Sequence, residues 1–241
     1  MKHLLIVFSF LLATNLSAQK ATTRVVVCLY ERLDFNTDFP ISEIGDINKI
    51  DELLVYDSLR SLLGGQLAEF SSQEVVFEVL TPNESYYFEQ KGLKKEMSNP
   101  SRKGIDLNSI SDREFWIFMN NHQADYLLFV NYYQIDKFRV DDEQMEILKR
   151  TIPSFYLVSA LSERKAPKYS EHLIDFDVFD VNKQRILSFG NFGIPILKFK
   201  PETMALKGLD FYTIKKTYRN LAKKLWEELT LAIEEQSAIR K

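Results

Sequence analysis

The chain has 241 residues, of which 45% are hydrophobic and 27% are charged, and its formal net charge is -3. Charges of both signs are interspersed along it, which argues against a nucleic-acid-binding surface and for an ordinary soluble one. The only cysteine, Cys28, excludes an internal disulfide, and its apolar neighbours predict a buried strand residue rather than a catalytic thiol. A hydrophobic core must therefore hold the fold together, and a chain of this length can build one.

The amino-terminal segment has the pattern of a secretory signal peptide. A short basic start is followed by an apolar run over residues 4–13 and then by small and polar residues, which is the three-part plan of such segments. The apolar run is shorter than the roughly 20 residues that span a bilayer. We therefore expect residues 1–19 to be removed, by a cut after Ala18 or after Gln19, and the protein to be exported.

The rest of the chain adds to this expectation. No cysteine closely follows the apolar run, which disfavours a lipid anchor, and no later stretch approaches the length of a membrane span. The sequence thus predicts a mature protein without an integral membrane span. It would be periplasmic, associated with the outer membrane, or extracellular.

Two strands and a long helix are predicted in the first third of the mature chain. Arg24 to Tyr30 is rich in β-branched residues and predicts a buried strand, and Glu74 to Leu80 predicts a second one. Between them, leucines recur at helical spacing over Lys49 to Phe70. The polar stretch from Glu31 to Asn48 is expected to be a loop with at most one short helical turn.

Several local patterns refine these elements. Asp46 or Asn48 is a candidate N-cap for the long helix, and the pair Gly64-Gly65 inside it predicts a kink or a close approach of another segment. Further on, Ser111 and Glu114 match the capping-box spacing at the start of a short helix.

The second half of the chain predicts further strands and a closing helix. Asp125 to Arg139 is a long strand, and the polar turn Asp180 to Gln184 predicts a hairpin. The other predicted elements are a strand over His172 to Val181, its return strand over Arg185 to Phe192, a further strand over Phe155 to Leu161, and a last helix over Phe211 to Gln236 capped by Asp210.

This order predicts an α/β (α+β) fold, with a mixed β-sheet of about five strands covered by two long helices and one short helix. No segment between the elements has the composition of a flexible linker. We therefore expect one domain over residues 20–241, with polar insertions near 84–110 and 141–170.

The element order resembles a group of bacterial envelope domains. Asp125-Tyr126, which enters a predicted strand, the hairpin over Asp175 to Leu187 and the closing helix over Phe211 to Ile233 are similar to the amino-terminal domain of TolB and to CsgG-like and penicillin-binding-protein-activator domains. The Ala-Gln junction after the apolar run resembles exported proteins of the Bacteroidetes. The resemblance implies an envelope protein that binds other proteins, and it implies no catalytic residue.

Few residues are candidates for chemistry. His122 and His172 are the histidines of the mature chain, and their spacing matches no metal-binding motif, so we expect structural or surface roles for both. Asp175 and Asp177 share one face of a predicted strand and could share a proton or a metal in a hydrolase. The alternation of the strand predicts instead that this face meets solvent.

Tyrosines and lysines are candidates for an interaction surface, since tyrosine is favoured where an apolar and a wet environment meet. The candidates are Tyr86, Tyr87, Tyr132, Tyr133, Lys94 and Lys95. The leading hypothesis is an exported, non-enzymatic envelope protein without a cofactor that contacts an envelope protein partner, for instance in outer-membrane or wall assembly. The alternatives are a hydrolase using Asp175 and Asp177, and a carrier of an apolar ligand, suggested by the 18 phenylalanines.

Overall fold

The computed structural model describes residues 22–72, 74–91, 94–96, 103–138, 169–196 and 209–239. The predicted signal peptide and the predicted strand over residues 155–161 lie outside these ranges, as does most of the insertion near 141–170.

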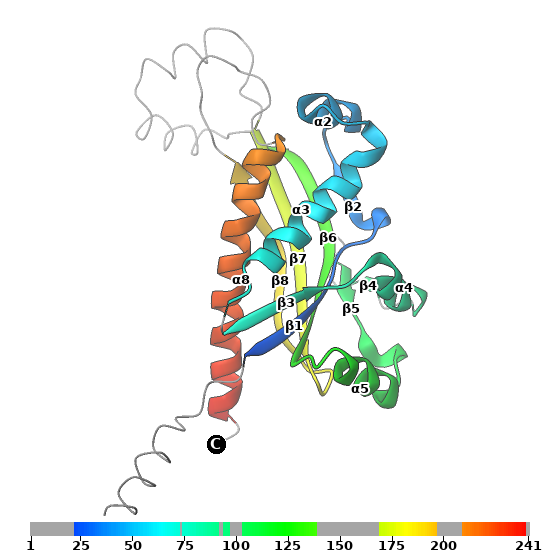
Figure 1. The fold of residues 1–241 in the computed structure, drawn as a ribbon, viewed down its shortest axis with the longest axis vertical. Helices are drawn as coiled ribbons and strands as arrows, with labels where there is room; N and C mark the ends of the chain where they lie inside the picture. Colours follow the sequence, from blue (N-terminus) through cyan, green and yellow to red (C-terminus); the bar gives the residue numbers. More distant parts are fainter. Residues whose placement is uncertain are drawn as a thin grey trace, which may run out of the picture.

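A mixed β-sheet forms the centre of the molecule (Figure 1). Its strands follow the order β3-β1-β6-β7-β8, and a short strand, β2, also pairs with β6. β1 pairs in parallel with β3 and β6, whereas β6, β7 and β8 pair antiparallel. The strands are β1 (Thr23–Cys28), β2 (Phe35–Thr37), β3 (Val75–Val79), β6 (Tyr126–Phe138), β7 (Tyr169–Asp180) and β8 (Arg185–Ile196), while β4 (Lys94–Glu96) and β5 (Lys103–Ile105) form a separate pair. The predicted mixed sheet is confirmed.

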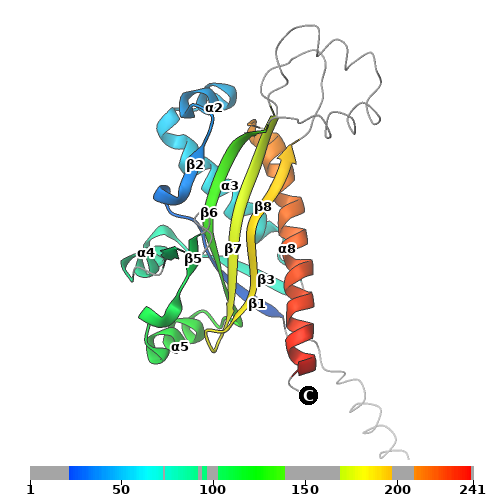
Figure 2. The ribbon, with the colours of Figure 1, turned by 180° about the vertical axis from the view of Figure 1, so that it is seen from behind.

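Helices lie on both sides of this sheet. Two long helices, α3 and α8, cover one face, and α4 and α5 lie beside the other (Figures 1 and 2). The helices are α2 (Ile41–Asn48), α3 (Val55–Glu69), α4 (Pro82–Gln90), α5 (Asp112–Asn121) and α8 (Phe211–Ile239), with 3-10 turns η1 (Arg32–Asp34), η2 (Glu52–Leu54) and η3 (Leu107–Ser109). The two long helices are those that the leucine periodicity predicts.

The larger core lies between the sheet and the helices α3 and α8. Leu63 and Leu67 of α3 and Leu225 of α8 are buried against the sheet. A Cβ atom at Gly64 would lie 2.9 Å from Leu29 Cδ1, so the glycine permits α3 to pack closely on the end of β1. The predicted close approach is therefore confirmed, whereas α3 continues through Gly64-Gly65 as one helix.

A smaller core lies on the opposite face. Phe88 of α4 and Phe115 and Met119 of α5 pack against the sheet residues Phe129 and Phe179. The predicted capping box starts α5: the Ser111 hydroxyl accepts a hydrogen bond from the Glu114 amide, and the Glu114 carboxylate accepts one from the Ser111 amide.

The structure corrects the prediction for residues 31–54. This stretch forms η1, β2, α2 and η2 rather than a loop, and the long helix starts at Val55 instead of Lys49. Lys49 has a positive φ of 56°, which ends α2 and prevents one continuous helix. The cap assignments change accordingly. Asp51 caps η2, and the Asn48 side chain accepts a hydrogen bond from Phe211 N, 2.7 Å away, at the start of α8.

The second half of the chain agrees more closely with expectation. Asp210 caps α8 as predicted, accepting a hydrogen bond from Thr213 N at 2.8 Å. The predicted hairpin joins β7 to β8, and Cys28 is buried at the end of β1. The polar insertion near 84–110 contains most of α4, together with β4, β5 and η3.

Candidate functional site

The pairing of β6 with its neighbouring strands is interrupted on both sides at Asn131. On one side, β1 pairs with β6 as far as Phe129, and β2 resumes the pairing at Tyr133. On the other side, the register against β7 shifts between Val130 and Tyr132. Bulges of this kind aim side chains in new directions and are frequent near functional sites. The fully buried Asn131 therefore marks a point where the pairing of β6 changes on both of its sides.

Asp177 of β7 receives several hydrogen bonds at this point. The Asn131 amide donates to Asp177 Oδ2 at 2.7 Å, Ile105 N donates to the same oxygen at 3.2 Å, and the Ser188 hydroxyl donates to Oδ1. Arg185 Nε lies 3.4 Å from Oδ1. A fully buried carboxylate needs such donors, so Asp177 is held in place by its neighbours.

The same contacts attach β5 to the sheet. Arg185 donates to Ile105 O at 2.6 Å, while Ile105 N donates to Asp177. The Asp177 carboxylate thus accepts a hydrogen bond from the backbone N–H of Ile105, and the Arg185 guanidinium donates one to the backbone carbonyl of the same residue. We call Asp177, Asn131, Ser188, Arg185 and Ile105 the carboxylate clamp.

Asp175 shares a face of β7 with Asp177, as predicted, but both side chains are fully buried. The expectation that this face meets solvent is therefore wrong. For Asp177 the reason is the segment containing β5, which covers it and contacts it through Ile105 N. No local pattern in the sequence predicts that this segment packs on the sheet. Asp177 accepts from so many donors that it is better suited to positioning β5 than to attacking a substrate. Within the described part of the chain, no group of three or more His, Cys, Asp or Glu side chains is arranged to hold a metal ion.

Tyr132 lies beside the bulge in acidic surroundings. Partial burial raises the pKa of Tyr132, and the carboxylates of Asp136, Asp175 and Asp34 raise it further, against a hydrogen bond from Asn36. Its phenol is therefore neutral at ordinary pH.

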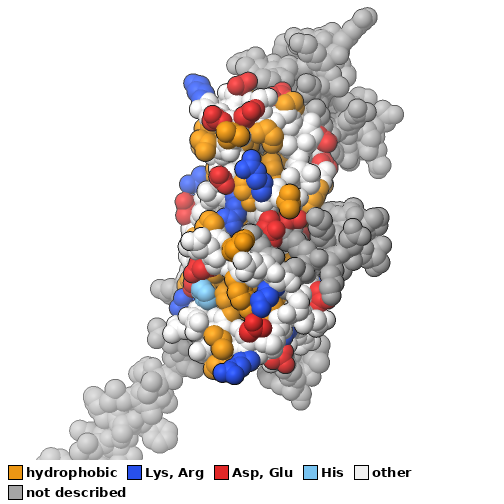
Figure 3. Space-filling model, turned by 90° about the vertical axis from the view of Figure 1, so that its right-hand side faces the viewer, with side chains coloured by type: hydrophobic (Ala, Val, Ile, Leu, Met, Phe, Trp, Pro, Cys, Tyr) orange, Lys and Arg blue, Asp and Glu red, His pale blue; other side chains and the backbone are white. Residues whose placement is uncertain are grey.

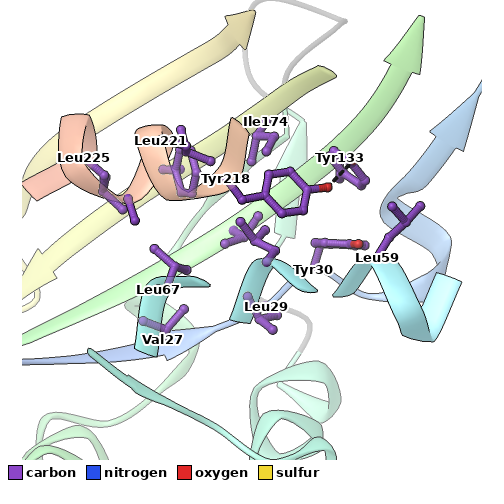
Figure 4. Close-up of a cluster of buried hydrophobic side chains, with 14 of the residues drawn as sticks. Val27, Leu29, Tyr30, Leu59, Leu67, Tyr133, Ile174, Tyr218, Leu221 and Leu225 are labelled. Atoms are coloured by element: carbon purple, nitrogen blue, oxygen red, sulfur yellow. Dashed lines mark hydrogen bonds between the residues drawn. The ribbon is translucent and has the colours of Figure 1, made fainter. Parts of the chain in front are cut away.

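His172 belongs to a polar chain inside the larger core. The Tyr218 hydroxyl donates to the Tyr133 hydroxyl, shown by the dashed line in Figure 4, and Tyr133 lies 2.5 Å from His172 Nδ1. Burial raises the pKa of both tyrosines well above the ordinary value, so both remain protonated donors. These contacts join α8 to β6 and β7.

His122 occupies a different environment at the end of α5. Its Nδ1 lies 2.7 Å from Glu78 Oε1, and Arg24 Nη2 lies 2.8 Å from Glu78 Oε2. Partial burial alone would raise the pKa of Glu78, but the hydrogen bonds from His122 and Arg24 hold it below its usual value. These contacts link the carboxyl-terminal end of α5 to the strands β1 and β3.

The predicted interaction surface is divided by the fold. Tyr133 is fully buried and cannot contribute to a surface, because the bulge turns it toward α8. Tyr132 is half-buried at the bulge, while Tyr86 is exposed on α4 and Tyr87 packs beside Phe118. Lys94 and Lys95 lie in β4, and their side chains are outside the described part of the structure.

Two exposed apolar surfaces were missed by the sequence reasoning. One comprises Trp116 and Ile117 on α5, together with Tyr86 on α4, the helix that packs against α5. The other comprises the exposed Leu33 in η1 and the exposed pair Leu53 and Leu54 in η2. An apolar residue out of phase with the buried face of α5 could have revealed Trp116, since Phe115 and Met119 define that face.

The comparisons with known proteins leave the family open. No protein-family model and no curated protein matches the sequence. Among solved structures, the chain is similar to a neuraminyllactose-binding hemagglutinin homologue from Helicobacter pylori, with 9% identity, 92% of this chain and 90% of that chain covered, and a TM-score of 0.35. At that level the similarity assigns neither fold nor function. Among the helices of the described residues, none combines the length and the apolar character needed to cross a membrane.

Proposed function

We propose that this protein is an exported, non-enzymatic component of the bacterial cell envelope that works by binding another envelope protein. The observation that supports this most directly is the exposure of large aromatic side chains on α4 and α5. Trp116 is 61% exposed and Tyr86 is 55% exposed. Tryptophan and tyrosine are the residue types that most often dominate the binding energy of protein interfaces. We call Tyr86, Trp116 and Ile117 the aromatic surface.

The layer beneath the aromatic surface is firmly packed. The rings of Tyr87 and Phe118 are parallel, with centroids 6.4 Å apart, and Phe88 meets Phe118 edge-on at 4.8 Å. Lys91 Nζ lies 2.9 Å from Glu114 Oε1, which adds a polar link between α4 and α5. A pre-organised support of this kind reduces the ordering cost of binding.

The geometry favours binding over the two alternatives. Asp177 serves the carboxylate clamp, which weakens a hydrolase mechanism that needs both Asp175 and Asp177 free to react. For an apolar-ligand carrier, the phenylalanines would have to line a cavity. Phe88, Phe115 and Phe129 instead pack into the smaller core. Export itself rests on the predicted signal peptide, and a role in outer-membrane or wall assembly is part of the proposal.

Site-specific crosslinking in cells tests the proposal. A photoreactive amino acid would replace Trp116, and in a control it would replace Tyr212, which is exposed on α8. We expect a discrete adduct with an envelope protein from position 116 and none from position 212. The Trp116→Ala, Tyr86→Ala double variant should weaken that complex by about 2 kcal/mol or more. Identical adduct patterns from both positions, or catalytic turnover that is lost in Asp175→Asn, would contradict the proposal.

A further inference from the structure

Negative charge is concentrated in one short part of the chain. Residues 31–57 contain eight acidic and two basic residues, so their formal charge is -6, whereas the whole chain carries -3. The remainder of the sequence therefore sums to +3. Acidic residues are therefore enriched in this part of the chain, although charges of both signs are interspersed over the chain as a whole.

The same part of the chain exposes three leucines. Leu33 is 86% exposed, Leu53 is 65% exposed and Leu54 is 53% exposed. A single exposed leucine is ordinary, but a group of them at one end of a molecule is typical of a contact surface. Asp51, Glu52 and Asp57 flank the pair in sequence, are exposed, and form no ion pair with any residue in the described ranges.

Contacts between η1 and the start of α3 place the leucines at the same end of the molecule. The Arg32 guanidinium lies 5.7 Å from the centre of the Tyr56 ring, and the Tyr56 hydroxyl donates to Tyr30 O at 3.0 Å. Leu33 follows Arg32, and Leu54 comes two residues before Tyr56. Figure 3 shows hydrophobic side chains gathered among acidic ones at the end of the molecule that carries α2. We call Leu33, Leu53, Leu54, Asp51, Glu52 and Asp57 the acidic leucine surface.

The backbone under this surface is well supported. Asp51 Oδ1 accepts a hydrogen bond from Leu53 N at 2.8 Å, and Ile50 N donates to Gly45 O at 3.0 Å. A Cβ atom at Gly45 would lie 2.9 Å from Ile50 O, so α2 and the turn before η2 are in close contact. The leucine pair is thus presented by a defined turn.

We propose that the acidic leucine surface binds a basic, amphipathic polypeptide segment of a partner protein. Lysine or arginine side chains would meet Asp51, Glu52 and Asp57, and apolar side chains of the segment would cover the leucines. A second copy of the chain would bring like charges together, and a bilayer surface is itself negative, so charge disfavours both. This inference rests on the proposed binding function but concerns a different surface from the aromatic one.

A synthetic peptide provides the probe. It would have about 18 residues, with leucine at helical i, i+3, i+4 and i+7 spacing and lysine elsewhere, and a control peptide would replace each lysine by glutamate. Binding to the chain without residues 1–19 would be followed by fluorescence anisotropy at low and high salt. We expect binding of the lysine peptide that weakens with salt, and none of the glutamate peptide.

Two variants and two matched controls locate the binding site. The triple variant Leu33→Ser, Leu53→Ser, Leu54→Ser and the double variant Glu52→Lys, Asp57→Lys should each weaken binding roughly tenfold or more. The controls on α8, Leu231→Ser and the pair Glu234→Lys, Glu235→Lys, also change exposed residues and should stay within about twofold of the unmodified protein. Circular dichroism should be unchanged in all four.

Three results would overturn this inference. One is the absence of binding of the lysine peptide, and another is an equal loss of affinity in the α8 controls. The third is binding to phosphatidylglycerol vesicles that depends on the three leucines, which would indicate a membrane surface instead. Because Trp116 is unchanged throughout, failure of this test leaves the crosslinking result at the aromatic surface to be judged separately.

Discussion

On one face of the sheet, α3 and α8 are held by a large layer of aliphatic and aromatic side chains, whereas α4, α5 and β5 are held to the other face by a smaller apolar cluster and the carboxylate clamp. Both faces also contain a buried polar chain. In the larger core it is Tyr218, Tyr133 and His172, which adds to extensive apolar contact. In the smaller one, Asp177 compensates for limited apolar burial. We therefore expect the free energy of unfolding to fall more when the Asp177 carboxylate is removed than when the Tyr218 hydroxyl is removed.

The largest expected effect comes from breaking the carboxylate clamp. Asp177→Ala would leave Asn131, Arg185 and the amide of Ile105 without their buried acceptor. Each donor left unsatisfied by the loss of a buried acceptor costs about 1–3 kcal/mol, so the total for these donors is expected to reach about 3 kcal/mol or more. Urea unfolding should show a decrease of this size in the free energy of unfolding. Hydrogen exchange should rise first in β5 and α5, and a loss below about 1 kcal/mol would show that the clamp contributes little.

A pair of glycine substitutions tests the tighter packing of the α3 face. Gly64→Ala would place a Cβ atom 2.9 Å from Leu29 Cδ1 and 3.2 Å from Val79 Cγ1, and overpacking of this kind costs about 1–3 kcal/mol. At Gly65 an added Cβ would meet no atom within 4 Å. Gly65→Ala should therefore raise stability by about 1 kcal/mol through helix propensity. Equal changes in thermal unfolding for both variants would contradict the close contact.

The hydrogen-bonded chain of Tyr218, Tyr133 and His172 in the larger core should contribute less to the free energy of unfolding than the carboxylate clamp. Tyr218→Phe removes the hydroxyl that donates to Tyr133 while keeping the ring, and loss of one such bond costs about 1 kcal/mol. The exposed Tyr212→Phe on α8 is the control and should have no measurable effect. If Tyr218→Phe lowered the free energy of unfolding as much as Asp177→Ala does, the proposed contrast between the two faces would be wrong.

The smallest expected effect is the contribution of Glu114, in the first turn of α5, to the pH dependence of the free energy of unfolding. Hydrogen bonds from Lys91 and Ser111 lower the pKa of Glu114 from 4.5 to about 2. Since the pKa is lower in the folded state, the carboxylate stabilises the fold above about pH 4.5, and this contribution is lost as the pH falls toward 2. In thermal unfolding between pH 5 and 2, Glu114→Gln should show a slightly shallower loss of stability than the unmodified protein. Parallel curves would rule out this role, and Glu228→Gln on α8 is a control.

Local patterns were sufficient for most elements of the fold. The alternation in β7, the turn before β8, the capping box at Ser111 and the cap at Asp210 all depend on neighbours within four residues, so the sequence predicts them correctly. Where a distant residue determines the local structure, the prediction was wrong. Asn48 looked like the cap of the next helix, yet it accepts a hydrogen bond from Phe211 at the start of α8.

The sequence by itself determined the longer strands β1, β3, β6, β7 and β8, the two long amphipathic helices, and the likeness of the predicted export segment to a signal peptide, because these depend on hydrophobic periodicity and length. It did not predict the short elements β2, α2, β4 and β5. Only the tertiary structure decided the environment of each candidate side chain. The alternation of β7 predicts that Asp175 and Asp177 face solvent. Asp177 is nevertheless buried, because Ile105 of β5, 72 positions earlier in the chain, packs against it. Arg32 of η1 likewise meets Tyr56 at the start of α3, which brings the segments that carry Leu33 and Leu53–Leu54 toward each other only in the folded chain. Burial and proximity depend on contacts between segments far apart in sequence, which no local pattern encodes.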